Sequence, residues 1–319
     1  MSNPLPITLR IGTRGSDLAL HQADLTEAAL ESAFPELKLE RRIIKTTGDR
    51  RTDAALADIA KEEGVFDKGV FIKEIEQALE DGTVDLAVHS LKDMPTILGD
   101  GFELASVLPR AAVRDVLITR DGSDLKTLPE GSRVGTSSPR RAKQVEYLRP
   151  DLKIIDLRGN VPTRLKKLAT GEKLDAILLA EAGLVRLGFM LETPHGNHGE
   201  RLVGFDNLTA FRLPEDELYP AAGQGAIGLE IRWSDKQTRM LAKTIECIPT
   251  WTRITAEREF LRLLDAGCHT PVGVFSTLNK GLISMKARVF PEAGGKPRTS
   301  EAVGDDPYDV ARALFEGLK

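Results

Sequence analysis

Apolar residues follow two spacings along the chain, and the order of these spacings predicts alternating helices and strands. Leucines and alanines recur at helical spacing over 18–29, and a short apolar run at 42–44 follows them. The same order returns over 142–148, followed by the run 154–157. This similarity indicates an internal repeat of a strand–helix–strand unit, although two such units can also resemble each other by chance.

A second pair of segments continues the repeat. A helical pattern over 72–79 leads to the apolar run 84–88, and a pattern over 165–168 leads to the run 174–179. Runs without polar alternation are typical of strands buried on both faces, which favours parallel sheets. A further apolar run at 226–231 follows a polar, Gly- and Pro-rich segment that we interpret as a long connection, and this late strand is expected to return to the first lobe.

The turns that open the two repeats also match. Each has a Gly-Thr pair after an apolar run, then a serine at the position of a helix cap, Ser16 in the first copy and Ser138 in the second. Pro139 follows Ser138, at the helical position that tolerates proline best. Two helix N-termini are therefore expected at strand ends, where free N–H groups bind anions.

The last third has a different pattern. Helical spacing over 254–264 precedes an alternating strand at 283–289 and a final helix near 310–314. The predicted fold class is therefore α/β, with two similar lobes around a cleft and a small C-terminal α+β domain. The expected boundaries are 1–110 with 222–243 for lobe 1, 111–221 for lobe 2 and 244–319 for the C-terminal domain.

Charge and composition narrow the class of protein. The 319 residues carry a formal net charge of −4, so a general nucleic-acid partner is not expected. No run approaches the ~20 apolar residues of a membrane helix, and the first residues have no signal-peptide pattern. The two cysteines, Cys247 and Cys268, are too few for a disulfide framework. We expect a cytoplasmic protein without a membrane partner.

Cationic side chains gather where the predicted strands end. Arg14, Arg140, Arg141, Arg158 and Arg164 all lie at or just after such ends. Because a guanidinium recognises carboxylate or phosphate through a planar fork, this set predicts a ligand with several negative charges. The alternative is that they are solvated residues on helix faces. The motifs of nucleotide-binding loops do not occur, so nucleotide binding has no specific support.

Other residues have candidate chemistry. Asp93 follows a buried strand directly, where a carboxylate can stabilise a cation or transfer protons, or merely cap the loop. Cys268 lies in a Gly- and Pro-flanked loop, where a thiolate can act as a nucleophile; Cys247 is more typical of a buried residue. His195 and His198 have metal-like spacing but lack a third ligand, so no metal is expected. Residues 64–71 are a candidate flap.

These segments, in this order, resemble the porphobilinogen deaminase (hydroxymethylbilane synthase) family. The resemblance extends from Ile11 to about Gly273, and it is specific because six short motifs occur together and in sequence. The matching stretches are Thr13-Arg14-Gly15-Ser16, Val88-His89-Ser90-Leu91-Lys92-Asp93-Met94-Pro95, Val134-Gly135-Thr136-Ser137-Ser138, Leu157-Arg158-Gly159-Asn160, Gly223-Gln224-Gly225-Ala226 and Gly267-Cys268.

The resemblance implies lobes of the periplasmic-binding-protein type (type II) and a transferase of tetrapyrrole and haem biosynthesis. The family condenses four porphobilinogen molecules head to tail, releases ammonia and forms hydroxymethylbilane. Its primer is a covalently bound dipyrromethane cofactor, attached by a thioether to the cysteine that matches Cys268. Each pyrrole has an acetate and a propionate, so the growing chain is a polyanion. The family also implies a monomer.

Residue roles are carried over only where the motifs match. The resemblance makes Asp93 the catalytic carboxylate. Cofactor binding is implied for Lys92, Thr136, Ser138, Arg140, Arg141 and Arg164. Substrate binding is implied for Arg14, Ser16, Arg158, Asn160, Arg186 and Gln224. The flap would contribute Lys68 and Phe71.

Three departures from the family pattern are present: Pro139, a less glycine-rich flap, and a longer segment over 190–219. Two other functions fit the predicted fold, because fold alone does not fix function. One is a two-lobed ligand-binding module, either a solute receptor or the effector domain of a regulator. The lack of a signal-peptide pattern argues against a periplasmic receptor, and no separate DNA-binding segment is evident. A phosphoribosyl-transfer enzyme would use the same helix N-termini for phosphates but would give Cys268 no role.

Overall fold

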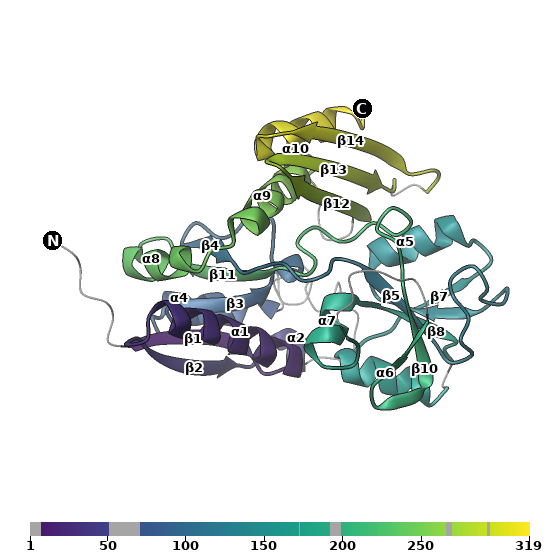
Figure 1. Cartoon of the computed structure of the whole chain (residues 1–319), viewed down its shortest axis with the longest axis horizontal. Helices are drawn as coiled ribbons and strands as arrows, with labels where there is room; N and C mark the ends of the chain where they lie inside the picture. The colour runs from purple at the N-terminus through teal and green to yellow at the C-terminus, as the bar shows by residue number, and fades with distance from the viewer. Residues whose placement is uncertain (1–7, 51–70, 172, 192–198, 266–269, 292–293) are drawn as a thin grey trace. The chain divides into compact units, whose positions relative to one another are not determined.

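The computed structural model describes residues 8–50, 71–171, 173–191, 199–265, 270–291 and 294–319 (Figure 1). The chain folds into two compact units. Unit 1 contains residues 1–110 and 226–255, and unit 2 contains residues 111–225 and 256–319. Each unit is described by itself. The chain enters unit 2 after residue 110 and returns to unit 1 at residue 226, as expected for a late strand that rejoins the first lobe.

Unit 1 is built on a five-stranded sheet in the described residues, with the strand order β2-β1-β3-β11-β4. The first three strands are parallel, and β11 runs antiparallel to both of its neighbours. The strands are β1 (Thr8–Arg14), β2 (Lys38–Ile44), β3 (Leu86–Ser90), β4 (Phe102–Val107) and β11 (Ile227–Arg232).

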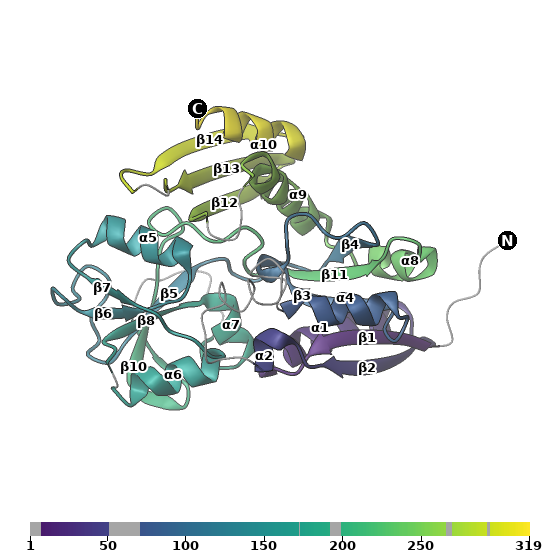
Figure 2. The ribbon, with the colours of Figure 1, turned by 180° about the vertical axis from the view of Figure 1, so that it is seen from behind.

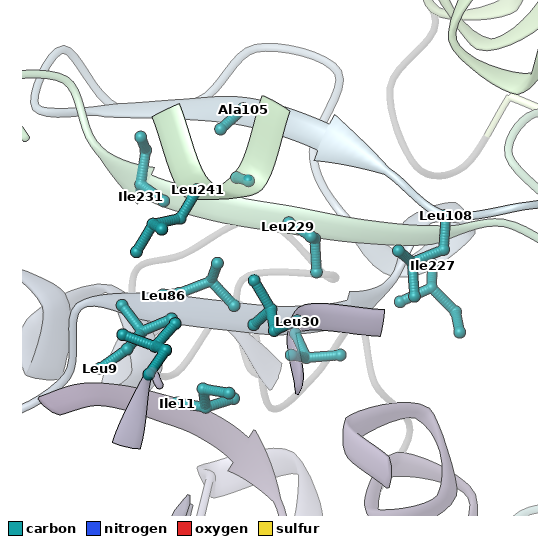
Figure 3. Close-up of a cluster of buried hydrophobic side chains, with 13 residues drawn as sticks. Leu9, Ile11, Leu30, Leu86, Ala105, Leu108, Ile227, Leu229, Ile231 and Leu241 are labelled. Atoms are coloured by element: carbon teal, nitrogen blue, oxygen red, sulfur yellow. The ribbon is translucent and has the colours of Figure 1, made fainter. Parts of the chain in front are cut away.

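Helices cover both faces of this sheet (Figure 2). On one face, α1 (Asp17–Ala33) and α8 (Lys236–Thr244) enclose the core shown in Figure 3, where leucines and isoleucines of β1, β3 and β11 meet Leu30 and Leu241. On the other face, Ile75 and Leu79 of α4 (Lys73–Glu80) pack against Val84 and Ala87. The remaining described helices that begin in unit 1 are α2 (Thr47–Arg50), the 3-10 turn η2 (Leu91–Asp93) and α9 (Ile248–Leu263).

Unit 2 contains a sheet with the same plan, in the order β7-β6-β8-β5-β10-β9. β6 is parallel to β7 and β8, and β5 is antiparallel to β8 and β10. The strands are β5 (Asp115–Thr119), β6 (Arg133–Gly135), β7 (Lys153–Ile155), β8 (Ala176–Ala180), β9 (Glu200–Leu202) and β10 (Phe205–Arg212). Helices α5 (Pro139–Leu148), α6 (Val161–Ala169) and α7 (Glu181–Arg186) accompany them.

The C-terminal part of unit 2 has its own hydrophobic core. A three-stranded antiparallel sheet packs its apolar face against Phe260 of α9 and Leu314 of the last helix. Its elements are β12 (Val272–Asn279), β13 (Leu282–Val289), β14 (Arg298–Gly304) and α10 (Pro307–Glu316). The mixed α/β class with a small antiparallel C-terminal part is therefore confirmed.

The internal repeat is confirmed by equivalent hydrogen bonds in the two sheets. In unit 1, the backbone N–H and the guanidinium of Arg10 donate to the Asp85 carboxylate at 2.7–2.9 Å. In unit 2, Arg133 donates to Asp175 in the same way at 2.8–3.2 Å. Asp85 and Asp175 directly precede the equivalent central strands β3 and β8. Taking these two aspartates as equivalent therefore gives the residue-by-residue correspondence between the two strands.

The helix over 18–29 is confirmed as α1, and one other expectation is corrected. Leu25, whose spacing helped to predict α1, is 40% exposed, and the helix buries Ala19, Ala23 and Leu30. The polar segment near 188–220 is not only a connection: it contains β10, which pairs with β5 over four residues. Its strand pattern was concealed because exposed polar residues at its start are followed by three consecutive buried residues, so apolar and polar positions do not alternate regularly.

Candidate functional site

A pocket in unit 1 opens at the carboxyl ends of β1 and β3. Ser16 caps α1 there, since its side chain accepts from the Ala19 backbone N–H at 3.4 Å. The first turn of α1 thus lies beside the pocket, as the sequence predicts. The lining residues are Arg14, Ser16, Leu18, Ala19, Gln22, Phe71, Ile72, Val88, His89, Ser90 and Asp93.

Asp93 is presented to this pocket by the short turn η2, which follows β3 directly. The side chain is half-buried, and it forms no hydrogen bond or ion pair with a described residue. A loop-capping aspartate would accept backbone N–H groups. The geometry therefore favours a carboxylate that faces a ligand over one that stabilises its own loop.

Arg14 lies in the same pocket and is held by a partner that the sequence did not identify. Its guanidinium forms an ion pair with Asp49, with Nε at 3.1 Å from Oδ2, and lies 4.2 Å from the centre of the Phe71 ring. Burial alone would raise the pKa of Asp49, but Arg14 outweighs it and holds that pKa below its usual range. Arg14 thus faces the pocket from a fixed position.

Gln22 and Ser90 were also missed. The Gln22 amide donates to Ser90 Oγ at 2.8 Å, and Ser90 Oγ donates back to Gln22 Oε1 at 3.1 Å. This reciprocal pair joins α1 to the end of β3, two residues before Lys92. A polar residue on the buried face of a helix was the available signal, because Gln22 is 2% exposed.

In unit 2, the N-terminus of α5 gathers several of the predicted cofactor-binding residues. Ser138 caps the helix through the Arg141 backbone N–H, and Thr136 Oγ1 accepts from the Ser138 N–H at 3.2 Å. Arg140 and Arg141 follow in the first turn, and both are buried, at 6% and 5% exposure. The predicted capped turn and its two arginines are brought together here.

Both arginines share one carboxylate, Asp115, which the sequence did not single out. Asp115 Oδ2 lies 2.7 Å from Arg140 Nη1, and Oδ1 lies 2.7 Å from Arg141 Nη2. The Gln224 amide donates to the same Oδ1 at 3.0 Å. Burial would raise the pKa of Asp115, but the two guanidinium groups prevail and hold it far below its usual range. The signal available was a lone acid at the start of an apolar strand.

Three arginines of unit 2 have guanidinium groups that are available to bind an anion. Arg140 Nε and Arg158 Nη1 are buried and have no hydrogen-bond partner among the described residues. Arg186 of α7 donates to the Gly225 carbonyl at 2.8 Å, and burial lowers its pKa to about 10 without an acidic partner. Because a buried guanidinium is costly without a counter-charge, these positions favour anionic groups from a ligand.

The remaining predicted residues have defined local positions. Arg164 of α6 donates to the Gly159 carbonyl at 2.7 Å. The Asn160 side chain caps α6 by accepting from the Thr163 N–H at 2.9 Å. Cys268 and Lys68 lie outside the described residues, as do His195 and His198. The described residues contain no group of three metal-binding side chains and no helix long and apolar enough to cross a membrane.

Glu76 of α4 is a further titratable group near the pocket. Burial raises its pKa to about 7; the nearby Glu230 acts in the same direction, and His89 opposes it. A raised pKa means that the fold favours the protonated form. The resulting stabilisation is present below the ordinary glutamate pKa of about 4.3 and is lost as the pH rises through about 7.

We expect Glu76→Gln to stabilise unit 1 at alkaline pH, because glutamine cannot acquire the disfavoured charge. Since the side chain is only half-buried, we expect a gain of about 1–2 kcal/mol near pH 8 and almost none near pH 4. Both tryptophans, Trp233 and Trp251, lie in unit 1, so urea unfolding followed by tryptophan fluorescence reports on this unit. A gain that does not depend on pH would contradict the assignment.

The fold and these side chains define an α/β protein with buried cations at its strand ends, an arrangement that favours a small-molecule ligand with several negative charges. Comparison with known proteins specifies the family. A model of "Porphobilinogen deaminase, dipyromethane cofactor binding domain" matches residues 9–240, and one of its C-terminal domain matches residues 251–318. The chain belongs to the porphobilinogen deaminase family.

Individual relatives agree with this assignment. The porphobilinogen deaminase of Syntrophobacter fumaroxidans is 42% identical over 93% of this chain and 92% of its own. That of Moorella thermoacetica is 42% identical over 98% of this chain and 93% of its own. Solved structures with some likeness include the BenM effector binding domain with benzoate, 17% identical over 76% of this chain and 91% of that one (TM-score 0.42). Another is substrate binding domain 2 of Lactococcus lactis GlnP, 13% identical over 76% and 90% (TM-score 0.42).

The residues present fit a dipyrromethane. Such a group carries four carboxylates, and unit 2 has buried guanidinium atoms on Arg140 and Arg158 that lack a partner among the described residues. The N-terminus of α5 adds backbone donors next to them. The donors are therefore of the right charge and kind for this cofactor, whose binding domain is the matched family model.

Proposed function

We propose that this protein is a hydroxymethylbilane synthase. It condenses four porphobilinogen molecules head to tail, releases ammonia, and hydrolyses the product to hydroxymethylbilane. The observation that supports this most is the family match over residues 9–240 together with buried, partly unpaired arginines in the same segment. From the family resemblance we also propose a cytoplasmic monomer, with a third domain over 244–319 that attaches the cofactor through Cys268.

The binding residues are those that the family resemblance implies. Arg140, Arg141 and Arg164, with Lys92, Thr136 and Ser138, hold the carboxylates of the dipyrromethane. Arg14, Ser16, Arg158, Asn160, Arg186 and Gln224 hold the incoming ring or the growing chain. Arg186 has a buried guanidinium with no acidic partner, so a substrate carboxylate supplies the missing counter-charge. The family resemblance assigns a flap to Phe71 and to Lys68, which lies outside the described residues.

Asp93 is the catalytic carboxylate. When the C–N bond of porphobilinogen breaks, its electron pair leaves with nitrogen as ammonia, and the pyrrole becomes a cation. A carboxylate without a protein partner among the described residues is available to stabilise that cation through the pyrrole N–H. When bound, the dipyrromethane supplies the α-carbon that forms the new C–C bond. Asp93 then accepts the proton that the coupled carbon releases.

Arg14 and Asp115 belong to binding groups that are fixed before the ligand binds, and they take no part in proton transfer. Asp49 and Phe71 fix the guanidinium of Arg14 at the pocket wall. Asp115 holds two guanidinium groups that would otherwise repel each other in a buried place. Preformed binding groups of this kind lower the cost of ordering a charged ligand.

The covalent attachment is tested by Cys268→Ser. We expect the wild-type protein to have an intact mass above the sequence mass by two linked pyrrole units, with peptide mapping assigning the excess to Cys268. The serine variant should lack it, because a hydroxyl is a poor nucleophile beside a thiolate. Cys247→Ser is the matched control and should keep the added mass.

Two outcomes would contradict the proposal. A Cys268→Ser protein that still carries dipyrromethane would exclude the attachment site. A wild-type protein that gains no mass and releases no ammonia on incubation with porphobilinogen would exclude the enzyme.

A further inference from the structure

Unit 1 contains a buried ion pair that the proposed mechanism does not use. Glu230 on β11 is fully buried, and its Oε2 lies 2.8 Å from Nε2 of His89 on β3. The imidazole N–H is not directed at the oxygen, so the contact is a close polar contact that becomes an ion pair when His89 is protonated. Neither side chain hydrogen-bonds to another described residue. A buried carboxylate is costly without a polar partner, and the polar side chain that contacts Glu230 among the described residues is His89.

At the positions of lobe 2 that are equivalent to His89 and Glu230, the chain has apolar residues. Asp85 and Asp175 are equivalent, because each binds the equivalent arginine before the central strand of its sheet. Counting four residues onward, His89 of β3 corresponds to Leu179 of β8. Leu179 is 3% exposed and belongs to the hydrophobic core of its lobe.

The position of Glu230 on β11 is also occupied by an apolar residue on the equivalent strand β5 of unit 2. In unit 1, Glu230 is paired in register with Ala87; in unit 2, Ile118 is paired with Ile177, which is equivalent to Ala87. Ile118 is completely buried. The same fold therefore forms this layer from an isoleucine and a leucine in lobe 2 and from a glutamate and a histidine in lobe 1.

Stability does not explain the difference. Replacing a buried ion pair with apolar residues of similar size is often neutral or stabilising, since the pair must lose its hydration. The fold of this chain accepts the apolar version in its other half. The charged version occurs in the lobe that carries Asp93, so its position relative to Asp93 is the relevant feature.

The pair lies directly beneath the turn that presents Asp93. His89 lines the same pocket as Asp93 and precedes it by four residues. The turn rests on β11 at Gly228, where an added Cβ would lie 2.9 Å from Leu91 and 3.2 Å from the Met94 sulfur. Gly228 is the residue opposite His89 in the register. The ion pair therefore joins β3 to β11 at the place where the turn is seated.

We propose that His89 and Glu230 form a positioning pair, which fixes the C-terminal end of β3 and thereby the orientation of the Asp93 carboxylate. This inference rests on the proposed function for its kinetic consequence but not for its structural one. Apolar side chains pack without a preferred direction, whereas an ion pair defines the relative position of the two strands. Neither residue touches the substrate in this role.

Three other charged groups face the pair. Glu76 of α4 interacts with both members, and Arg14 of β1 and Asp93 of η2 line the pocket beside His89.

The test replaces the pair in lobe 1 with the apolar residues found at the equivalent positions of lobe 2. The double variant His89→Leu, Glu230→Ile reproduces the Leu179 and Ile118 layer, so we expect it to fold, to unfold at a temperature no lower than wild type, and to acquire the cofactor mass. Its kcat should fall at least tenfold, with KM for porphobilinogen changed less than about threefold. Hydrogen exchange of the peptide over 90–94 should become faster, and this readout does not depend on activity.

Asp85→Asn is the matched control. It breaks an ion pair of the same lobe at the other end of β3, and it should lower stability without changing kcat or the exchange of residues 90–94. The single variant Glu230→Gln removes the carboxylate that His89 contacts, so it should lower both stability and kcat.

Each remaining outcome decides the question. A folded double variant with wild-type kcat and wild-type exchange over 90–94 would overturn the positioning role. A double variant that does not fold would overturn it too, because the pair would then serve stability. If wild type makes no hydroxymethylbilane, the proposed function fails, and the exchange comparison still tests the pair.

Discussion

Replacing Asp93 with asparagine is expected to lower kcat by at least about a thousandfold, because the variant loses both a charge that stabilises a cation and a proton acceptor. The fold should be unaffected, since the Asp93 side chain makes no hydrogen bond or ion pair within the described part of the chain. The measurement is the rate of hydroxymethylbilane formation by purified, cofactor-loaded protein, with thermal unfolding recorded in parallel.

Two further variants make the Asp93 experiment specific. Asp93→Glu keeps the charge but moves it, so it should retain more activity than the asparagine variant. Asp100→Asn changes an exposed acid seven residues later and should leave the rate unchanged. An Asp93→Asn enzyme that turns over at a near-normal rate would show that another group stabilises the cation.

Replacing Asp115 with asparagine is expected to have the largest effect on stability. The change leaves two guanidinium groups buried without their counter-charge, and removal of one partner of a buried pair costs about 3–5 kcal/mol. Arg140, Arg141 and Gln224 all lose a contact with the same carboxylate. Because the pKa of Asp115 is held below its usual range, the wild-type stabilisation is present at neutral pH and is lost only in strong acid.

The stability of unit 2 must be followed with a probe other than tryptophan, since both tryptophans belong to unit 1. Hydrogen exchange of peptides from β5 and β8 in urea meets this need. Glu146→Gln, which breaks an exposed pair with Lys143 on α5, is the matched control and should have almost no effect. If Asp115→Asn is as stable as this control, the two arginines have other counter-charges.

The order of elements could be predicted from the sequence because repeated local patterns specify it. Ser16 and Ser138 are helix caps as expected, and the run at 226–231 forms β11 in the first sheet. The buried face of α1 could not be predicted from the leucines. Small residues such as Ala19 and Ala23 allow a helix to approach a sheet closely, so Leu25 was left exposed.

In the candidate site, too, some residues could be predicted from the sequence and others could not. Its cations were predictable, since an arginine that directly follows an apolar run lies at a strand end, where α/β sheets bind their ligands. Their partners were not, because Asp49 and Asp115 are distant from Arg14 and Arg140 in sequence and carry no local pattern. The ion pair of His89 with Glu230 spans 141 residues, so only the completed sheet brings the two together.

The position of β11 also has a consequence for the order in which the chain acquires structure during synthesis. The sheet of lobe 1 is interrupted until β11, which lies between β3 and β4, has left the ribosome. The six-stranded sheet of lobe 2 uses only strands between residues 115 and 212, so all of its strands are available earlier. The half of the protein that is translated first is therefore completed second, and its β3 and β4 edges stay unpaired while lobe 2 forms. Fragments ending near residue 225 should consequently depend on chaperones more than the full chain does.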